Sequence, residues 1–355
     1  MNIFNIIHLG PGKVGKAFLK YFKENRLIIE KNYRISLRLI GVFSSHLCYI
    51  NEKGIDIKII EKIINDDFSI LKNVEKNDLS SLINKFKQPF IIIDTTSSDK
   101  TFSILESGLK RGGFVVMSNK KPLSSDLKMF NSLFAQYKQR LYFETTVGAG
   151  LPVITTIREL IETGDRVVDI QGCFSGTLGY IFTLLQQEKS FSQAVIQARE
   201  KGYTEPDPRD DLSGLDVARK ALILSRLLGS NLSLKDVKLS PLYPINMNQL
   251  STDEFLKKVD ILNSNYHRLM IKAKNEKKTL RFVAKINNKT CMIGLNKVDL
   301  TSDIGSLYGP DNIVIIKTER YFNNPLVIKG PGAGLEVTAA GVLGDLLKII
   351  KIIRL

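Results

Sequence analysis

The chain has 355 residues, of which 43% are hydrophobic and 25% are charged, a globular composition with room for two or three packed units. Its formal charge of +15 would suit nucleic acid, but the lysines are scattered along the chain, which argues against a nucleic-acid-binding protein. The three cysteines, Cys48, Cys173 and Cys291, form no CxxC pair, so the sequence predicts neither a zinc site nor a disulfide framework and favours a reducing compartment.

No part of the chain has the pattern of a targeting or membrane segment. The first residues carry no basic patch followed by an apolar core, so no secretory signal is expected. No uninterrupted apolar run is long enough to span a bilayer. We therefore expect a cytoplasmic protein.

The first part of the chain alternates predicted strands with predicted helices. Apolar runs predict strands at residues 3–9, 35–43, 90–94 and 114–118, and amphipathic spacing predicts helices at 16–23, around 59–64 and at 101–110. This alternation is typical of an α/β fold with a Rossmann-type parallel sheet and right-handed crossovers. A Gly-Ala-Gly-Leu-Pro segment follows Val147, and we expect the nucleotide-binding domain to span residues 1–146.

The second part of the chain has a different pattern. Residues 168–174 predict a strand, residues 177–187, 191–201 and 215–228 predict helices, and two runs near 279–298 and 313–321 again have strand character. We expect a second, α+β domain over residues 147–330. The last predicted helix, 337–350, is apolar on much of its surface and needs a partner. Residues 331–355 are therefore expected to return to the N-terminal domain and complete it.

A glycine-rich turn, Gly10-Pro11-Gly12-Lys13-Val14-Gly15, lies between the first strand and the first helix. In a GxGxxG turn the first glycine permits the tight bend, the second lets the backbone approach a pyrophosphate, and the third lets the helix lie near the strand. The free N–H groups at the start of the helix then face the pyrophosphate. The pattern predicts cofactor contacts from Gly10, Gly12, Lys13, Val14 and Gly15, and an ordinary glycine-rich loop is the alternative.

The region after the second strand bears on the choice of cofactor. Sites for NAD usually carry Asp or Glu there, which binds the ribose 2′-hydroxyl. Here the sequence reads Ser44-Ser45-His46, without an acid. Hydroxyl groups and a histidine can accommodate a 2′-phosphate, so we expect NADP, with NAD still possible and Ser44 as a candidate contact. Simple turn chemistry explains the two serines equally well.

An acidic loop lies between two of the predicted helices. It runs from Gly202 to Asp211, contains two prolines that stiffen it and carries four carboxylates. Such a loop suits a cationic partner, for example a substrate ammonium group. Capping of the next helix by Asp211 or Ser213 is the alternative, and it explains one acid but not the cluster.

Two lysines are candidates for a chemical role. Lys120 follows a strand of the predicted sheet, and ligands of such folds lie at the carboxyl ends of the strands; a solvated lysine is the alternative. Lys220 follows Asp216 by four residues on an otherwise apolar helix, so both side chains share one face. A partly desolvated lysine near carboxylates can carry a proton, whereas a surface salt bridge is the less specific explanation.

Taken together, several segments resemble homoserine dehydrogenases, and the resemblance runs from end to end. It rests on GPGKVG from Gly10, Asp94-Thr95-Thr96, SNKKPL from Ser118, FETTVGAGLPV from Phe143, GYTEPDPRDDLSGLDVARK from Gly202 and GPGAGLEVTAAGVLGD from Gly330. The chain resembles a monofunctional form, without an aspartokinase-like extension or room for a regulatory ACT domain. Its Phe174-Ser175-Gly176-Thr177 segment is nevertheless similar to that of bifunctional enzymes. Many monofunctional relatives have Asn in place of Ser175, which leaves a substrate contact from this position open.

The resemblance implies an activity and a set of site residues. Homoserine dehydrogenases interconvert L-aspartate 4-semialdehyde and L-homoserine with NAD(P)H, on the route to threonine and methionine. The resemblance implies Lys220 as the general acid/base and Lys120 as a second catalytic lysine. It implies substrate contacts from Glu205, Asp216 and Tyr203, and further cofactor contacts from Thr96, Lys120 and Gly334. It also implies a monovalent-cation site, for Na⁺ or K⁺, at Glu144, Val147, Ala149 and Leu151. A hydrogen bond of Glu144 in the hinge is the alternative to the cation.

The resemblance also implies a homodimer or a dimer of dimers, formed through the middle region. Two rival functions fit the same predicted fold: another NAD(P)-dependent dehydrogenase of a small amino or oxo acid, and a non-catalytic NADP-binding sensor. The intact set of Lys120, Glu205, Asp216 and Lys220 argues against the sensor.

Overall fold

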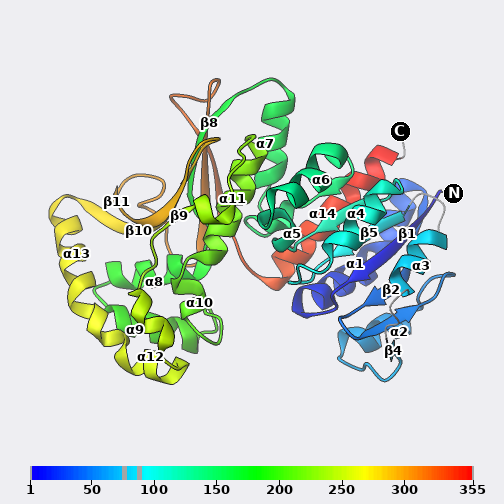
Figure 1. Ribbon diagram of the computed structural model, residues 1–355, viewed down its shortest axis with the longest axis horizontal. Helices are drawn as coiled ribbons and strands as arrows, with labels where there is room; N and C mark the ends of the chain where they lie inside the picture. Colours follow the sequence, from blue (N-terminus) through cyan, green and yellow to red (C-terminus); the bar gives the residue numbers. More distant parts are fainter. Residues whose placement is uncertain (1, 74–77, 86–89, 354–355) are drawn as a thin grey trace. The chain divides into compact units, whose positions relative to one another are not determined.

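The computed structural model describes residues 2–73, 78–85 and 90–353 and forms two compact units (Figure 1). Unit 1 comprises Met1–Gly150 and Gly334–Leu355, and unit 2 comprises Leu151–Ala333. Both divisions lie a few residues beyond the boundaries expected from the sequence.

Unit 1 contains a seven-stranded sheet, counted over the described residues, in the order β4-β3-β2-β1-β5-β6-β7. Its strands are β1 (Asn2–Leu9), β2 (Ile35–Phe43), β3 (Leu47–Ile50), β4 (Lys72–Asn73), β5 (Phe90–Asp94), β6 (Phe114–Met117) and β7 (Leu141–Tyr142). Five neighbouring strands, β2, β1, β5, β6 and β7, run parallel to one another, which confirms the Rossmann-type prediction. The edge strands β3 and β4 pair antiparallel, and they were not predicted because they are only four and two residues long.

The helices of unit 1 pack their apolar faces on this sheet. They are α1 (Lys13–Tyr33), α2 (Ile57–Ile64), α3 (Asp78–Lys85), α4 (Phe102–Lys110), α5 (Lys121–Ser124), α6 (Leu127–Tyr137) and the 3-10 turn η1 (Glu144–Thr146). The helix predicted at 16–23 extends to Tyr33, because the buried residues of α1 continue at helical spacing from Phe18 and Phe22 to Ile29. The sequence prediction missed α6.

The C-terminal helix α14 (Leu335–Ile353) belongs to unit 1 and lies beside α1 (Figure 1). It also contacts β6. Six of its residues join the same hydrophobic core as Phe18 of α1 and Ile91 of β5, namely Ala339, Val342, Leu343, Leu346, Ile349 and Ile350. Burial of each of the five valine, leucine and isoleucine side chains stabilises the fold by about 1.5–3 kcal/mol. The predicted return of the last helix to the nucleotide domain is confirmed.

Unit 2 is built on a six-stranded sheet, within the described residues, in the order β13-β12-β8-β10-β11-β9. Its strands are β8 (Val167–Cys173), β9 (Lys238–Leu239), β10 (Lys278–Ile286), β11 (Cys291–Asp299), β12 (Asp311–Thr318) and β13 (Leu326–Pro331). The run expected near 279–298 is a hairpin of two strands, because residues 287–290 form a turn in which Asn287 donates its backbone N–H to the carbonyl of Thr290 at 2.9 Å. The strand expected at 313–321 ends at Thr318.

The helices of unit 2 include the three expected from the sequence and several that were not. They are α7 (Val153–Glu162), α8 (Gly176–Gln186), α9 (Phe191–Glu200), α10 (Arg209–Leu212), α11 (Leu215–Leu227), α12 (Thr252–Lys258) and α13 (Asn263–Asn275), with 3-10 turns η2 (Leu234–Asp236), η3 (Ile245–Gln249) and η4 (Val259–Leu262). Neither α7, α12 nor α13 was predicted. Within the residues that the structure describes, no helix of either unit combines the length and apolarity needed to cross a membrane.

Candidate cofactor and substrate sites

The glycine turn of unit 1 has the geometry that its spacing predicts. Gly10 has φ +89°, and a Cβ there would lie 2.7 Å from a methyl carbon of Thr96. A Cβ on Gly15 would lie 2.1 Å from the carbonyl oxygen of Gly10. A Cβ on Gly12 would meet no atom within 4 Å. Gly10 and Gly15 are therefore required by the fold, whereas Gly12 faces open space that a ligand can enter.

The first turn of α1 fits the pyrophosphate of a dinucleotide. Gly12 occupies the N-cap position, no side chain caps the helix, and no acidic residue lies in its first turn. Lys13 is exposed and Val14 is half-buried. The N–H groups of this turn thus point outward with the positive end of the helix dipole, the arrangement that binds phosphate.

A hydrogen-bonded histidine lies directly beneath the glycine turn, and the sequence analysis missed it inside the apolar run of β1. His8 is fully buried, and its Nε2 lies 2.8 Å from the hydroxyl of Thr95. That hydroxyl donates to the carbonyl of Gly10 at 2.7 Å, so Nε2 must carry the hydrogen. Its Nδ1 has no partner among the described residues, and burial lowers the pKa of His8 to about 3. A neutral His8 therefore anchors the turn through Thr95.

We expect His8 to make the protein sensitive to mild acid. The unfolded chain binds a proton at this histidine below its ordinary pKa of 6.5, and the folded chain resists protonation down to about 3. Stability from this group is therefore complete above pH 6.5 and declines as the pH falls, by about 2 kcal/mol between pH 7 and pH 5. Urea unfolding at both pH values measures this loss. His8→Gln should lose about 2 kcal/mol less than the wild type, whereas the exposed His46→Gln control should follow the wild type; equal losses in all three proteins contradict the assignment.

Ser44 lies in the turn between β2 and β3. Its hydroxyl accepts a hydrogen bond from the backbone N–H of Leu47 at 2.8 Å and donates to the carbonyl of Leu47 at 3.0 Å. The turn chemistry considered as the alternative is thus present, and the hydroxyl hydrogen of Ser44 is already engaged. The neighbouring Ser45 and His46 are exposed.

A buried carboxylate organises the ends of β5 and β6, next to the predicted cofactor residues Thr96 and Lys120. Asp94 is fully buried and accepts hydrogen bonds from the backbone N–H of Thr96 at 2.9 Å and the side-chain amide of Asn119 at 3.0 Å. The same amide lies 3.1 Å from the hydroxyl of Thr96. Lys120 directly follows Asn119 and precedes α5. The Asp94–Asn119 pair therefore joins the two loops, a role that the sequence analysis did not assign to Asn119.

Gly334, the remaining predicted cofactor residue, opens the second segment of unit 1. Its φ is +130°, a backbone conformation that favours glycine. Its carbonyl accepts hydrogen bonds from the hydroxyl of Thr338 at 2.7 Å and from the backbone N–H of Thr338 at 3.0 Å. These bonds fix the start of α14.

In unit 2, Lys220 is held between two oxygen acceptors. Its ammonium donates to the carbonyl of Phe174 at 2.7 Å and lies 2.9 Å from a carboxylate oxygen of Asp216. The side chain of Lys220 is 12% exposed and that of Asp216 is 47% exposed. The interaction of Lys220 with Asp216 is therefore more than a solvated surface salt bridge, because Lys220 also donates to a main-chain carbonyl at the end of β8.

The start of α8 connects this lysine to the acidic loop. Ser175 caps α8 by accepting a hydrogen bond from the backbone N–H of Leu178 at 3.2 Å. Thr177 donates its hydroxyl to the carbonyl of Tyr203 at 2.6 Å, and the ring of Tyr203 lies 4.6 Å from that of Tyr180, centroid to centroid. The segment after β8 thus contacts both Lys220 and the loop that carries Tyr203.

The carboxylates of the acidic loop have separate roles. Asp207 pairs with Arg209, whose hydrogen bonds lower the pKa of Asp207 to about 2. Asp211 accepts a hydrogen bond from the backbone N–H of Glu205 at 2.8 Å. The N-cap of α11 is Gly214 and no side chain caps that helix, so the alternative explanation by helix capping does not hold. The carboxylate of Glu205 is exposed and makes no hydrogen bond or ion pair within the described ranges.

The acidic loop and α11 concentrate negative charge near Asp211. Burial raises the pKa of Asp211, and the like charges of Glu205 and Asp216 add to the increase, although the hydrogen bond from the backbone of Glu205 opposes it. These three carboxylates form an acidic cluster in unit 2. Such a cluster suits a ligand that carries an ammonium group.

The residues of the predicted cation site lie around the end of unit 1. Glu144 is 5% exposed, and one of its carboxylate oxygens lies 3.0 Å from the ammonium of Lys348 on α14. Burial works against the charge of Lys348, but Asp345 and Glu144 outweigh it and raise its pKa. Gly148 and Ala149 both have positive φ, and Leu151 is the first residue of unit 2. Glu144 therefore already has one cationic partner.

These features define a class: an α/β protein with a dinucleotide-binding Rossmann unit and a second unit that holds a half-buried lysine beside an acidic cluster. Family models agree in both units. A homoserine dehydrogenase model matches residues 152–347, and the model of the homoserine dehydrogenase NAD-binding domain matches residues 10–144. The chain belongs to the homoserine dehydrogenase family.

Individual relatives cover the whole chain. It is 38% identical to homoserine dehydrogenase from Saccharomyces cerevisiae, over 98% of both chains. It is 37% identical to bifunctional aspartokinase/homoserine dehydrogenase 2 from Zea mays, over 96% of this chain but only 38% of that protein, and it spans the same share of other bifunctional plant relatives. A crystal structure of a Candida auris protein described as of unknown function superposes with a TM-score of 0.89 at 33% identity, over 99% of both chains.

Proposed function

We propose that this protein interconverts L-aspartate 4-semialdehyde and L-homoserine by NAD(P)-dependent hydride transfer. The observation that carries the proposal is the position of Lys220, held by the carbonyl of Phe174 and by Asp216. Family membership supplies the substrate class. We assign the nucleotide to unit 1 and the amino acid to unit 2.

The proposed chemistry follows from the charges in unit 2. Bound nicotinamide nucleotide supplies or accepts the hydride. In the reducing direction the carbonyl oxygen of the aldehyde gains negative charge and needs a proton, and the ammonium of Lys220 provides both a positive charge and that proton. In the oxidising direction the neutral amine of Lys220 takes the proton from the hydroxyl of homoserine. We assign Glu205 and Asp216 to the substrate ammonium, Tyr203 to the same binding loop, and Lys120 to proton movement or polarisation.

Steady-state oxidation of L-homoserine with each cofactor tests the function. We expect reduction of the nicotinamide in the presence of L-homoserine, and no comparable rate with L-serine, which lacks one methylene group. Turnover only with another small amino or oxo acid would support the rival dehydrogenase. Failure of the cofactor-saturated protein to oxidise any of these substrates would support the non-catalytic sensor.

We further propose NADP as the preferred cofactor. What supports this is the absence of an acid after β2, where the turn carries Ser44, Ser45 and His46. Because the hydroxyl of Ser44 bonds Leu47, we assign the 2′-phosphate principally to the exposed Ser45 and His46, with Ser44 kept as a candidate. A higher kcat/KM with NADP than with NAD supports the assignment.

We propose a monovalent-cation site formed by Glu144 and the carbonyls of Val147, Ala149 and Leu151, in which Glu144 is shared with Lys348. The buried carboxylate and the two successive residues with positive φ support it. Thermal unfolding tests the site independently of activity. We expect NaCl or KCl to raise the melting temperature of the protein by about 2–4 °C above that in tetramethylammonium chloride of equal ionic strength. The Glu144→Gln variant should lose this difference. An equal melting temperature in all three salts contradicts the site.

We propose a homodimer formed through unit 2. A row of side chains crosses one face of its sheet, because each member lies opposite the next in register: Met292, Lys285, Gln171, Ile315 and Val327. Met292 and Val327 are 42% and 43% exposed, and a second copy of the sheet would bury them. We expect sedimentation at twice the monomer mass, and the double variant Met292→Glu/Val327→Glu should sediment as a monomer. A dimeric double variant contradicts this interface.

We propose a reducing compartment such as the cytoplasm for this protein. The three cysteines are all buried, and none of them forms a disulfide bond. Burial raises the pKa of both Cys173 and Cys291 to about 12, which keeps their thiols protonated and unreactive.

A further inference from the structure

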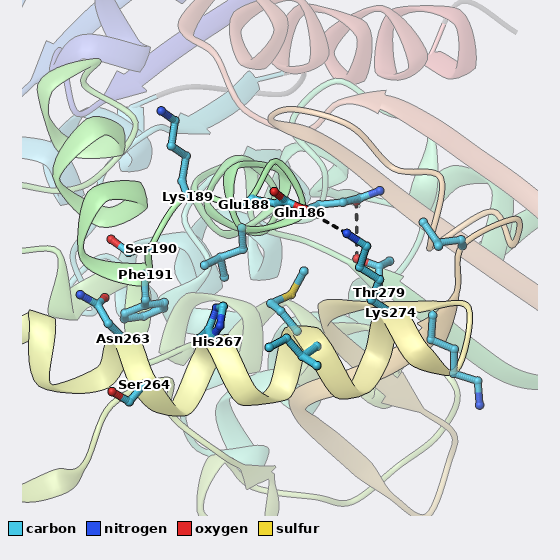
Figure 2. Close-up of a pocket in the computed structure, with 15 residues that line it drawn as sticks. Gln186, Glu188, Lys189, Ser190, Phe191, Asn263, Ser264, His267, Lys274 and Thr279 are labelled. Carbon is cyan, nitrogen blue, oxygen red and sulfur yellow. Dashed lines mark hydrogen bonds and ion pairs between the residues drawn. The ribbon is translucent and has the colours of Figure 1, made fainter.

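Unit 2 contains a cavity of about 700 Å³ that the proposed reaction does not use (Figure 2). It lies between the connection from α8 to α9 and one face of α13. Leu185 and Phe191, which line it from the α8–α9 side, are 4% and 0% exposed. His267, Met270 and Lys274 line it from α13, where their spacing of three and four residues places them on one helical face. The volume is in the range of small-molecule sites.

The lining combines an apolar part with an excess of positive charge. Its apolar members include Leu185, Phe191 and Met270, and its charged members are three lysines and one glutamate. The glutamate, Glu188, already pairs with Lys274 at 2.9 Å. Both side chains of this pair are more than three-quarters exposed, so the pair contributes little stability and can be rearranged by a ligand. The ammonium of Lys189 has no partner among the described residues.

We propose that this cavity binds a small organic acid, with its apolar body against Met270 and Ile271 and its anionic group toward the lysines and His267. The apolar lining would stabilise a hydrocarbon or aromatic body. The excess of cationic side chains favours an anion over a neutral or cationic molecule of the same shape. The cavity is therefore a ligand site of unit 2 that is separate from the acidic cluster, which favours cations.

The cavity and the proposed substrate residues lie at opposite ends of the same two helices. The start of α8 follows Phe174, the acceptor of Lys220, and its end contributes Leu185 to the cavity. The start of α9 contributes Phe191, and Ala198 near its end accepts the backbone N–H of Tyr203 at 2.9 Å. The eleven residues of α8 span about 16 Å. A ligand that displaces the α8–α9 connection would thus change the KM for the amino acid, a consequence that rests on the proposed function.

Binding is tested on the full chain saturated with NADP⁺, so that the nucleotide site is occupied. The probe is 1-anilinonaphthalene-8-sulfonate, and N-phenyl-1-naphthylamine, which has the same body without the sulfonate, is the matched neutral compound. We expect one sulfonate probe per chain by calorimetry and about tenfold weaker binding of the neutral compound. Binding that is absent, or equal for the two compounds, overturns the proposal.

Variants locate the probe. Met270→Trp should narrow the apolar part of the cavity and weaken binding, and Lys274→Gln should weaken it by about three- to tenfold. Lys257→Gln makes the same charge change on the exposed face of α12 and should bind as the wild type does. Unchanged binding by both cavity variants overturns the proposed location. Inactivity on homoserine with intact, cavity-dependent probe binding would instead refute only the proposed function.

Discussion

Replacement of Lys220 by methionine is expected to lower kcat for homoserine oxidation by about 10³-fold, in the range that general acid–base groups contribute. Methionine keeps much of the apolar length of the side chain but has no proton to move and no charge to offer a developing alkoxide. The dissociation constant of NADP⁺ should change by no more than about twofold, because Lys220 is not among the proposed cofactor contacts. Stopped-flow or steady-state kinetics and a cofactor titration measure the two effects.

Two further variants separate the proton role from a positioning role. Lys220→Arg retains a cation that can reach Phe174 and Asp216, but guanidinium does not give up its proton at ordinary pH. It should therefore remain nearly inactive in the oxidising direction. Lys235→Met removes an exposed lysine from η2 of the same unit and should retain full turnover. Recovery of activity in Lys220→Arg would show that charge alone suffices, and normal turnover of Lys220→Met would refute the assignment of the base.

The Gly12→Val substitution is expected to weaken cofactor binding by more than about 100-fold while the fold persists. A side chain at this position meets no atom of the protein within 4 Å, and its φ of −80° is ordinary for any residue. The melting temperature should fall by no more than a few degrees, since valine is a poorer N-cap residue than glycine by about 1 kcal/mol. The added methyl groups would occupy the space through which a pyrophosphate approaches the N–H groups of α1.

Gly15 provides the matched comparison for this prediction. A Cβ there would lie 2.1 Å from the carbonyl of Gly10 and 2.8 Å from the ring of His8, so Gly15→Val should unfold unit 1 or lower its melting temperature by more than 10 °C. Cofactor titration and thermal unfolding of both variants test the difference. Tight NADP⁺ binding by Gly12→Val contradicts the assignment of this turn to the pyrophosphate.

The glycine turn was predictable because each glycine has a local mechanical reason. Gly10 needs a positive φ, and Gly15 needs space beside Gly10, so spacing alone identified both. The pairing of Lys220 with Asp216 was also predictable, because a separation of four residues on a helix fixes the shared face. These are short-range features, and the structure confirms their geometry.

The interactions that escaped prediction join distant parts of the chain. Lys348 reaches Glu144 across 204 positions, and His8 owes its role to Thr95, which is 87 residues away. No local pattern marks either pair. The carbonyl of Phe174, which accepts from Lys220 across 46 residues, escaped for a second reason, since a backbone acceptor leaves no sequence signal.

The division of unit 1 between two chain segments has a consequence for biosynthesis. Its core contains six residues of α14, between Ala339 and Ile350, and all of unit 2 is translated before them. The apolar surface of α1 and β6 that α14 covers therefore stays exposed, or is bound by a chaperone, until the ribosome has synthesised all of unit 2. Ribosome-bound chains that stop before α14 should be cleaved readily by protease in unit 1, and the nucleotide-binding half, although made first, is the last to mature.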